Sequence, residues 1–182
     1  MSYLRRSITA AMLIALCVVF PMAFHAVGPI AGRTLLPMHI PVLLTGLICG
    51  PLFGLIVGLA GPLLSHLFTQ MPPSVMVAPM MIELATYGLV AGVMINLVHT
   101  RRLSADLYIS LIVAMLVGRI VAGIAQVVYF FEGTYAIGMW TTAYFVTSFP
   151  GIVIQLLLIP SLIIALERER VIPLRYPVST NA

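Results

Sequence analysis

The charged residues of this chain gather at the ends of long apolar runs, and this arrangement restricts the chain to a membrane protein. Nine arginines and five acidic residues carry the formal charge of the 182 residues. Most of them lie in three clusters: Arg5 and Arg6; Arg101, Arg102 and Asp106; and Glu167, Arg168, Glu169, Arg170 and Arg175. The runs between the clusters reach the roughly 20 residues that a helix needs to cross about 30 Å of hydrocarbon. Since only helices and closed barrels satisfy their backbone polar groups in lipid, such continuous runs predict helices.

The composition excludes a soluble domain and a nucleic-acid-binding protein. Hydrophobic residues make up 62% of the chain and charged residues 8%, with a mean hydropathy of +1.15. This leaves too few polar side chains to cover a water-facing surface. The net charge of +4 comes from arginines near segment ends, which mark cytoplasmic ends under the positive-inside rule. We therefore expect a lipid bilayer, and no nucleic acid, as the partner of this surface.

The apolar segments predict a single integral membrane domain over residues 1–182. Six spans are expected, at about 8–27, 35–49, 52–69, 77–98, 107–129 and 141–166. One helix over 35–69 would measure about 50 Å, too long for one crossing, so the chain is expected to break at Gly50-Pro51. With that break, parity places all three charged clusters on one side. The predicted fold is an all-α bundle of six transmembrane helices with both termini cytoplasmic.

This topology assigns the loops after the first, third and fifth spans to the outer face. These loops carry Arg33, Pro72, Pro73 and Glu132, and we expect them to gate any external pocket. The inner loops are shorter. Recognition chemistry is therefore expected mainly on the outer side.

Two charged residues, Glu83 and Arg119, lie inside apolar runs. A charge at such a position costs a few kcal/mol on insertion scales, roughly 2.5–3.5 at a helix centre, so it faces protein, a cavity or a partner. The two residues could form an ion pair that orients two helices. They could instead bind a ligand, with Arg119 donating to a carboxylate and Glu83 accepting from hydroxyl or amide groups. A proton relay through Glu83 is a third interpretation. Other polar residues in apolar context complete the candidate substrate site: His39, Tyr87, Gln126 and Tyr144.

Small residues recur at helical spacing. Gly46, Gly50, Gly54 and Gly58 repeat every four residues, and Gly88 and Gly92 repeat the spacing in the fourth predicted span. Since lipid provides little hydrophobic force between helices, small residues that allow close backbone approach are a usual packing device. Intramolecular packing is the favoured interpretation. The pair Ala11 and Ala15 on the first span could pack inside the bundle or against another membrane subunit.

Catalytic and metal-binding motifs are missing from the sequence. Cys17 and Cys49 lack the C-x-x-C spacing, and His39 and His66 lack any regular ligand spacing. No phosphate-binding loop, nucleophile elbow or dinucleotide fingerprint occurs. We therefore expect no enzyme activity, no cofactor and no metal. Any ATPase that drives this protein must be another polypeptide.

Several segments together resemble the substrate-binding subunits, or S components, of energy-coupling factor (ECF) vitamin transporters. The similar segments are Ala11-x-x-x-Ala15, Leu36-Pro-Met-His-Ile-Pro-Val-Leu-Leu-Thr-Gly-Leu-Ile-Cys-Gly-Pro51, Gln70-Met-Pro-Pro73, Glu83-Leu-Ala-Thr-Tyr-Gly88, Gly118-Arg-Ile120 and Phe149-Pro-Gly-Ile152. The resemblance covers nearly the whole chain and is more specific for the family than for the substrate.

The resemblance implies an importer subunit in a prokaryotic plasma membrane. It implies an external vitamin pocket capped by the three outer loops, and a module made of a transmembrane coupling subunit and two cytoplasmic ATPases. The family's coupling contact maps onto Ala11 and Ala15. Arg119 and Glu83 favour pantothenate, which offers a carboxylate, hydroxyls and an amide. Cobalamin, riboflavin, folate or another vitamin is an alternative ligand. Two other classes stay open, a proton-coupled secondary transporter that uses Glu83 and an intramembrane enzyme.

Overall fold

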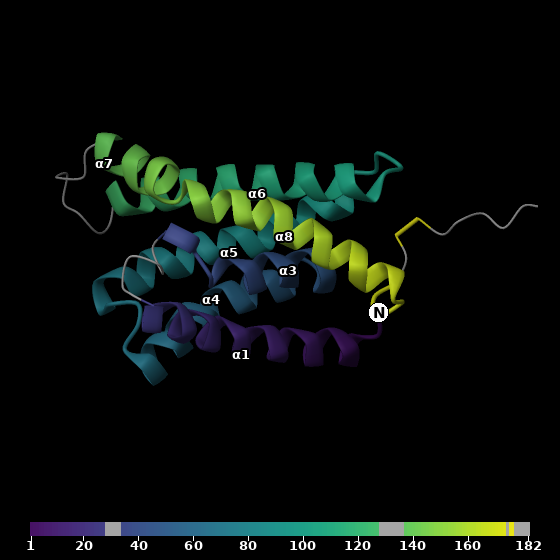
Figure 1. Ribbon diagram of the computed structural model, residues 1–182, viewed down its shortest axis with the longest axis horizontal. Helices are drawn as coiled ribbons and strands as arrows, with labels where there is room; N and C mark the ends of the chain where they lie inside the picture. The colour runs from purple at the N-terminus through teal and green to yellow at the C-terminus, as the bar shows by residue number, and fades with distance from the viewer. Residues whose placement is uncertain (28–33, 128–136, 174, 177–182) are drawn as a thin grey trace, which may run out of the picture.

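The described part of the chain is built from helices alone. The computed structural model describes residues 1–27, 34–127, 137–173 and 175–176, and Figure 1 shows its long helices running side by side. The elements are α1 (Tyr3–Val27), α3 (His39–Cys49), α4 (Pro51–Thr69), α5 (Ser74–Leu97), α6 (Leu103–Ala125), α7 (Ile137–Thr141), the π-helix η2 (Thr142–Thr147) and α8 (Phe149–Arg168). Five of them, α1, α4, α5, α6 and α8, contain stretches long and apolar enough to cross a membrane. The chain is an all-α, multi-pass membrane protein.

Glycine and proline separate α3 from α4. Gly50 has φ 100°, a backbone conformation that side chains other than hydrogen rarely permit. Pro51 then opens α4, where its missing N–H group is no loss because the first helical N–H groups have no intrahelical partner. The helix break predicted at Gly50-Pro51 is present.

α3 is shorter than the segment 35–49 predicted as the second span. It has 11 residues, about 16 Å of helix, which is half the thickness of the hydrocarbon layer. Nine of these residues are buried, and α3 contacts α1, α4, α5 and α8. Its apolar composition therefore serves packing between helices, and it faces little lipid.

The last predicted span, 141–166, is not one α-helix. The chain forms α7, then η2, then α8, which has Pro150 in its first turn. Proline removes a backbone donor from the helical ladder, so an α-helix cannot run through this point undisturbed. Hydroxyl groups bond to the local backbone instead. Thr142 Oγ1 donates to Gly138 O at 2.7 Å, and Ser148 Oγ donates to Tyr144 O at 2.5 Å.

The glycine repeat brings α3, α4 and α5 into close contact. A Cβ atom built on Gly88 of α5 would lie 2.2 Å from the carbonyl oxygen of Gly54 on α4. A Cβ on Gly46 of α3 would lie 2.3 Å from the carbonyl oxygen of Gly88. Glycine is thus required at this crossing, because any larger side chain would separate the backbones. The intramolecular packing favoured from the sequence is what these glycines perform.

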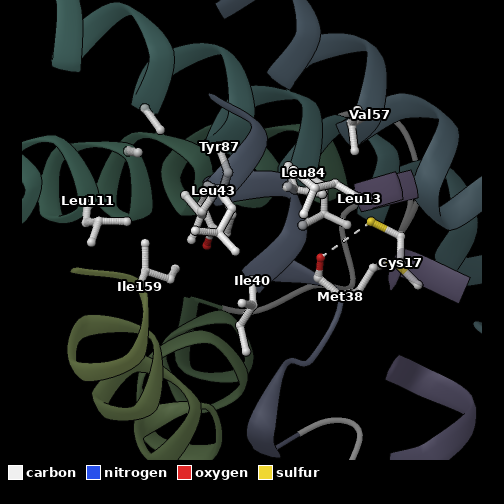
Figure 2. Packing of buried hydrophobic residues seen from close by; sticks show 14 of the residues in the cluster. Leu13, Cys17, Met38, Ile40, Leu43, Val57, Leu84, Tyr87, Leu111 and Ile159 are labelled. Carbon is white, nitrogen blue, oxygen red and sulfur yellow. Dashed lines mark hydrogen bonds between the residues drawn. The ribbon is translucent and has the colours of Figure 1, made fainter. Parts of the chain in front are cut away.

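The apolar core lies around α3. Leu43 of α3, Leu84 of α5, Leu111 of α6 and Ile159 of α8 are all completely or almost completely buried, and Figure 2 shows them packed together. Cys17 of α1 joins this core, with its Sγ atom 4.0 Å from the carbonyl oxygen of Met38. One continuous cluster therefore includes side chains from every long helix.

The charged clusters lie at one end of the bundle. Figure 1 places the N-terminus, the loop between α5 and α6, and the end of α8 at this end, which we call the basic end because it holds Arg5, Arg6, Arg101, Arg102 and Arg168. At the opposite end lie α7 and η2, which carry Trp140, Tyr144 and Phe145. We call this the aromatic end.

Candidate functional site

A buried polar group connects α3 and α5. Glu83 is 6% exposed and His39 2% exposed. The Tyr87 hydroxyl donates a 2.9 Å hydrogen bond to Glu83 Oε1, one helical turn away on α5. His39 Nε2 lies 3.5 Å from the same carboxylate oxygen without forming a hydrogen bond. The imidazole and phenol rings are tilted against one another, with centroids 5.3 Å apart.

Arg119 on α6 lies beneath the aromatic end. Its side chain is buried, with 3% of the residue exposed, and its Cζ atom lies 5.4 Å from the centroid of the Phe145 ring. Trp140 packs edge-on against Phe145, with centroids 5.3 Å apart. The indole Nε1 of Trp140 donates to the backbone carbonyl of Arg119 at 3.2 Å. The guanidinium group of Arg119 therefore lies over the Phe145 ring, and this aromatic face stabilises its charge.

A second polar contact joins α6 to η2. The Nε2 atom of Gln126 donates to the Tyr144 hydroxyl at 2.6 Å. Tyr144 and Phe145 are successive residues of the π-helix, and π-helical turns occur frequently at functional sites. The wider turn thus carries one ring toward Gln126 and the next toward Arg119.

Two glycines on α6 make room for rings from neighbouring elements. A Cβ atom on Gly118 would lie 2.0 Å from Cδ1 of Tyr87, and one on Gly123 would lie 2.4 Å from Nε1 of Trp140. Tyr87 therefore lies directly against the turn of α6 that carries Arg119. This contact places the His39–Glu83–Tyr87 group beside the Arg119 group.

Several buried polar atoms near these groups have no hydrogen-bond partner among the described residues. They are both ring nitrogens of His39, Nε and Nη2 of Arg119, Oε1 of Gln126 and Oε1 of Gln155. Burying such an atom unpaired costs roughly 1–3 kcal/mol, and more where the group is charged. Arg119 thus offers two donors of a planar fork, and the two amide oxygens offer acceptors. This combination suits a ligand that has a carboxylate and N–H or O–H groups.

A small cavity adjoins His39. It has a volume of about 60 Å³ and is lined by Pro21, Leu36, Pro37, Met38, His39, Met71, Pro72 and Met80. The Pro72 carbonyl accepts a 2.7 Å hydrogen bond from His66 Nδ1, which ties the loop between α4 and α5 to α4. Because a carbonyl can only accept, the proton of the His66 ring is on Nδ1. The cavity is apolar apart from His39.

The six predicted substrate residues lie in one region of the structure. Glu83 and Arg119 are not paired with one another there. His39, Glu83 and Tyr87 form one group, and Arg119, Gln126 and Tyr144 the adjacent one. Glu83 and Arg119 form no ion pair, so the interpretation of these two as a structural pair is wrong. Glu83 instead accepts a hydrogen bond from Tyr87, and the charge of Arg119 faces the Phe145 ring.

The predicted gating residues have mixed outcomes. Pro72 lines the cavity, whereas Pro73 is exposed and caps the start of α5. Arg33 and Glu132 lie outside the described residues. Within the described chain, no group of three or more His, Cys, Asp or Glu residues is arranged to hold a metal ion.

The predicted docking residues Ala11 and Ala15 lie on the exposed face of α1. The opposite face of α1 buries Ala10, Leu13 and Cys17 against the bundle. Ile8 and Met12 extend the exposed face. This face is available to lipid or to another membrane helix.

Three residues of the region were not among the predicted substrate residues. Phe145 and Trp140 are ordinary aromatic residues in the sequence, and nothing in their spacing points to Arg119. Gln155 is a buried amide on α8, and its Nε2 atom donates to the Leu36 carbonyl at 3.5 Å. An amide in the middle of a membrane-spanning helix is the one signal that could have singled it out.

A family model described as "ECF transporter, substrate-specific component" matches residues 5–163. No curated protein and no solved structure matches the chain.

Proposed function

The chain belongs to the substrate-specific components of ECF transporters, and on that premise we propose that it captures a carboxylate-bearing vitamin, with pantothenate slightly favoured, for ATP-driven import. The proposal rests on the side chain of Arg119. Its guanidinium group is buried, lies over the Phe145 ring and has two nitrogens without a partner in the described structure. A carboxylate would satisfy both donors in the bidentate geometry that arginine favours.

Pantothenate matches the remaining groups of the region. Its hydroxyls and amide N–H would donate to the free Oε1 atoms of Gln126 and Gln155, and Glu83 and Tyr144 would take further polar contacts. His39 and Tyr87 would orient Glu83. Cobalamin or another vitamin is the alternative ligand, and cobalamin would need a far larger opening than the present packing supplies.

Ligand entry requires the aromatic end to open. The cavity of about 60 Å³ beside His39 is well below the roughly 300–1,000 Å³ of ordinary ligand sites. We infer that the loop at Pro72 separates from the turn at Leu36–His39, since both line the cavity. The other proposed gating positions, Arg33, Pro73 and Glu132, belong to the same three predicted outer loops.

We propose six crossings with both termini cytoplasmic, in a prokaryotic plasma membrane, with the whole chain as one domain. α3 would supply the second crossing together with the residues before it, and the basic end would face the cytoplasm. Ala11 and Ala15 would contact the transmembrane coupling subunit of a module that also holds two cytoplasmic ATPases. Exposure of both alanines on α1 supports this placement.

Mass spectrometry of the small molecule released from the purified protein tests the ligand directly. We expect pantothenate to be recovered, and radiolabelled pantothenate to bind to the chain alone in detergent. Recovery of cobalamin or another vitamin would replace the favoured ligand and keep the transport role. A purified, folded chain that retains no vitamin and does not copurify with an ECF module would contradict the proposal as a whole.

Glu83 supports one second candidate function. Its carboxylate is buried and 3.5 Å from the His39 ring, which is an arrangement that could carry a proton in a secondary transporter. Such a transporter would import its substrate into liposomes without ATP, and the Glu83→Gln substitution would abolish this import. Uptake that depends on ATP and on a partner module excludes it.

A further inference from the structure

The C-terminal residues after α8 are bound to the start of α6 through a buried carboxylate. Arg170 has φ 55°, which ends α8 by turning the chain back, and the N–H group of Val171 bonds to the Leu166 carbonyl at 2.9 Å. Residues 171–173, 175 and 176, which we call the C-terminal clasp, then lie at the basic end (Figure 1). They follow the part of the chain that the family model matches.

Asp106, on α6, is the residue to which the clasp binds. It is completely buried and accepts hydrogen bonds from Arg175 Nε at 2.8 Å and from the Tyr176 hydroxyl at 2.5 Å. Its other oxygen accepts from the backbone N–H and the hydroxyl of Thr100, at 2.8 and 2.7 Å. A buried carboxylate is costly unless it is fully paired, so these four bonds explain why an acid is tolerated here.

Arg175 extends the contact to α5 and α8. Its Nη2 atom donates to the carbonyl oxygens of Ile95 and Val98, which are at the end of α5 and have no helical partner of their own. Its backbone N–H donates to Glu167 Oε1, at the end of α8, at 2.5 Å. One arginine therefore joins the ends of α5, α6 and α8.

The polar contacts between α6 and the last helical segment lie at its two ends in the described structure. At the aromatic end these are Gln126 with Tyr144 and Arg119 with Trp140 and Phe145. At the basic end they are those of the clasp. Between the two ends, Leu111 of α6 and Ile159 and Ile163 of α8 belong to the same apolar cluster. Figure 1 shows α8 crossing the bundle obliquely.

α8 has a close backbone contact near its aromatic end. A Cβ atom on Gly151 would lie 2.6 Å from the Thr34 carbonyl oxygen, so the α8 backbone rests directly on the segment before α3. From Gly151 to Glu167 the helix extends about 24 Å. With this contact as a pivot, a displacement at the clasp would rotate α8 and move η2 on its other side.

We propose that Asp106 and Arg175 are positioning residues for the vitamin site, acting through α8 as a lever. The clasp holds the basic end of α8 against α5 and α6, which keeps Tyr144 and Phe145 seated on Gln126 and Arg119 at the aromatic end. The effect on vitamin binding rests on the proposed function, whereas the mechanical link between the two ends does not.

The link can be measured without a ligand. Spin labels at Ser104→Cys on α6 and Ala165→Cys on α8 would report the separation at the basic end, since both positions are exposed. The native Cys17 and Cys49 are buried and would be replaced by alanine. The chain has one tryptophan, Trp140, so its emission in the same lipid vesicles reports the aromatic end.

Arg175→Gln should lengthen and broaden the distance between the labels and shift the Trp140 emission to longer wavelength. Arg168→Gln is the matched control, because it removes a positive charge from the exposed end of α8 without touching Asp106. A longer distance between the labels with unchanged Trp140 emission would overturn the lever. An unchanged distance between the labels would also overturn it. If Arg175→Gln fails to fold, Tyr176→Phe removes one bond to Asp106 and should produce the same changes at smaller amplitude.

Vitamin binding is tested separately with radiolabelled pantothenate. We expect Arg175→Gln to raise its dissociation rate by roughly fivefold or more, the lower range of coupling between distant sites, and Arg168→Gln to leave it unchanged. Binding by the parent chain with equal dissociation from both variants would overturn the positioning role. A parent chain that binds no pantothenate would instead contradict the proposed ligand, and the label and Trp140 measurements would still decide the lever.

Discussion

The ring of Tyr87 on α5 lies against Gly118 on α6, in the space that any side chain at position 118 would occupy. A Cβ atom there would be 2.0 Å from Cδ1 of Tyr87. Since Tyr87 is completely buried, the ring cannot swing out into solvent. The contact fixes the distance between the two helices that carry Glu83 and Arg119.

Gly118→Ala should therefore destabilise the protein by roughly 1–3 kcal/mol, the usual cost of overpacking a core. Thermal unfolding in detergent measures this as a lower Tm. Gly138→Ala is the matched control, because a Cβ atom at Gly138 meets nothing within 4 Å. Equal Tm values for the two variants would show that Tyr87 can move aside.

Tyr87→Phe should cost about 1–3 kcal/mol of stability, because Glu83 keeps its burial and loses its hydrogen-bond donor. Tyr108→Phe provides the comparison, since Tyr108 is 39% exposed. Denaturant unfolding followed by circular dichroism would detect the difference. A stability as high as that of Tyr108→Phe would mean that Glu83 finds another donor.

Arg119→Gln should lower pantothenate affinity by at least about 30-fold, the effect of losing roughly 2 kcal/mol from a buried charge-assisted contact. Arg119→Lys should recover only part of the affinity, because an ammonium group cannot reproduce the planar fork. Isothermal titration calorimetry measures both variants. Arg102→Gln, an exposed arginine at the basic end, should bind normally. Unchanged affinity in a folded Arg119→Gln protein would leave Arg119 with a structural role.

Ala11→Trp should prevent copurification with the ECF module while vitamin binding by the isolated chain is retained. The reason is steric, because the small exposed side chains of α1 allow a partner helix to approach closely. Ile112→Trp places the same ring on the exposed face of α6 and should copurify normally. Copurification of both variants in equal yield would show that the docking surface does not include Ala11.

The sequence was informative where a physical cost had to be met locally. Apolar runs predicted the long helices, Gly50-Pro51 predicted a break, and the expense of charge in lipid directed attention to Glu83 and Arg119. The side chains that contact Glu83 and Arg119 could not be predicted in the same way. Glu83 bonds to Tyr87 on its own helix, and Arg119 faces Phe145, because the packing of glycines and rings decides which elements approach.

The contact between Asp106 and Arg175 shows most clearly what could not be predicted from the sequence. Both stand in charged clusters at segment ends, where the positive-inside rule accounts for them without any contact. They are separated by 69 residues in sequence, and only the turn at Arg170 brings them together. The interruption of the last predicted span was only partly visible, since Pro150 marks the start of a helix but nothing in residues 142–147 specifies a π-helical turn.

The enclosure of α3 has a consequence for how the protein is made. A helix of 11 residues is too short to cross the hydrocarbon layer by itself, and α3 is enclosed by other helices. Because α4 and α5 follow it in the chain, α3 can reach its place only after they have been synthesised and inserted. Substitutions in α3 should therefore impair late assembly in the membrane, and leave the insertion of α1 intact.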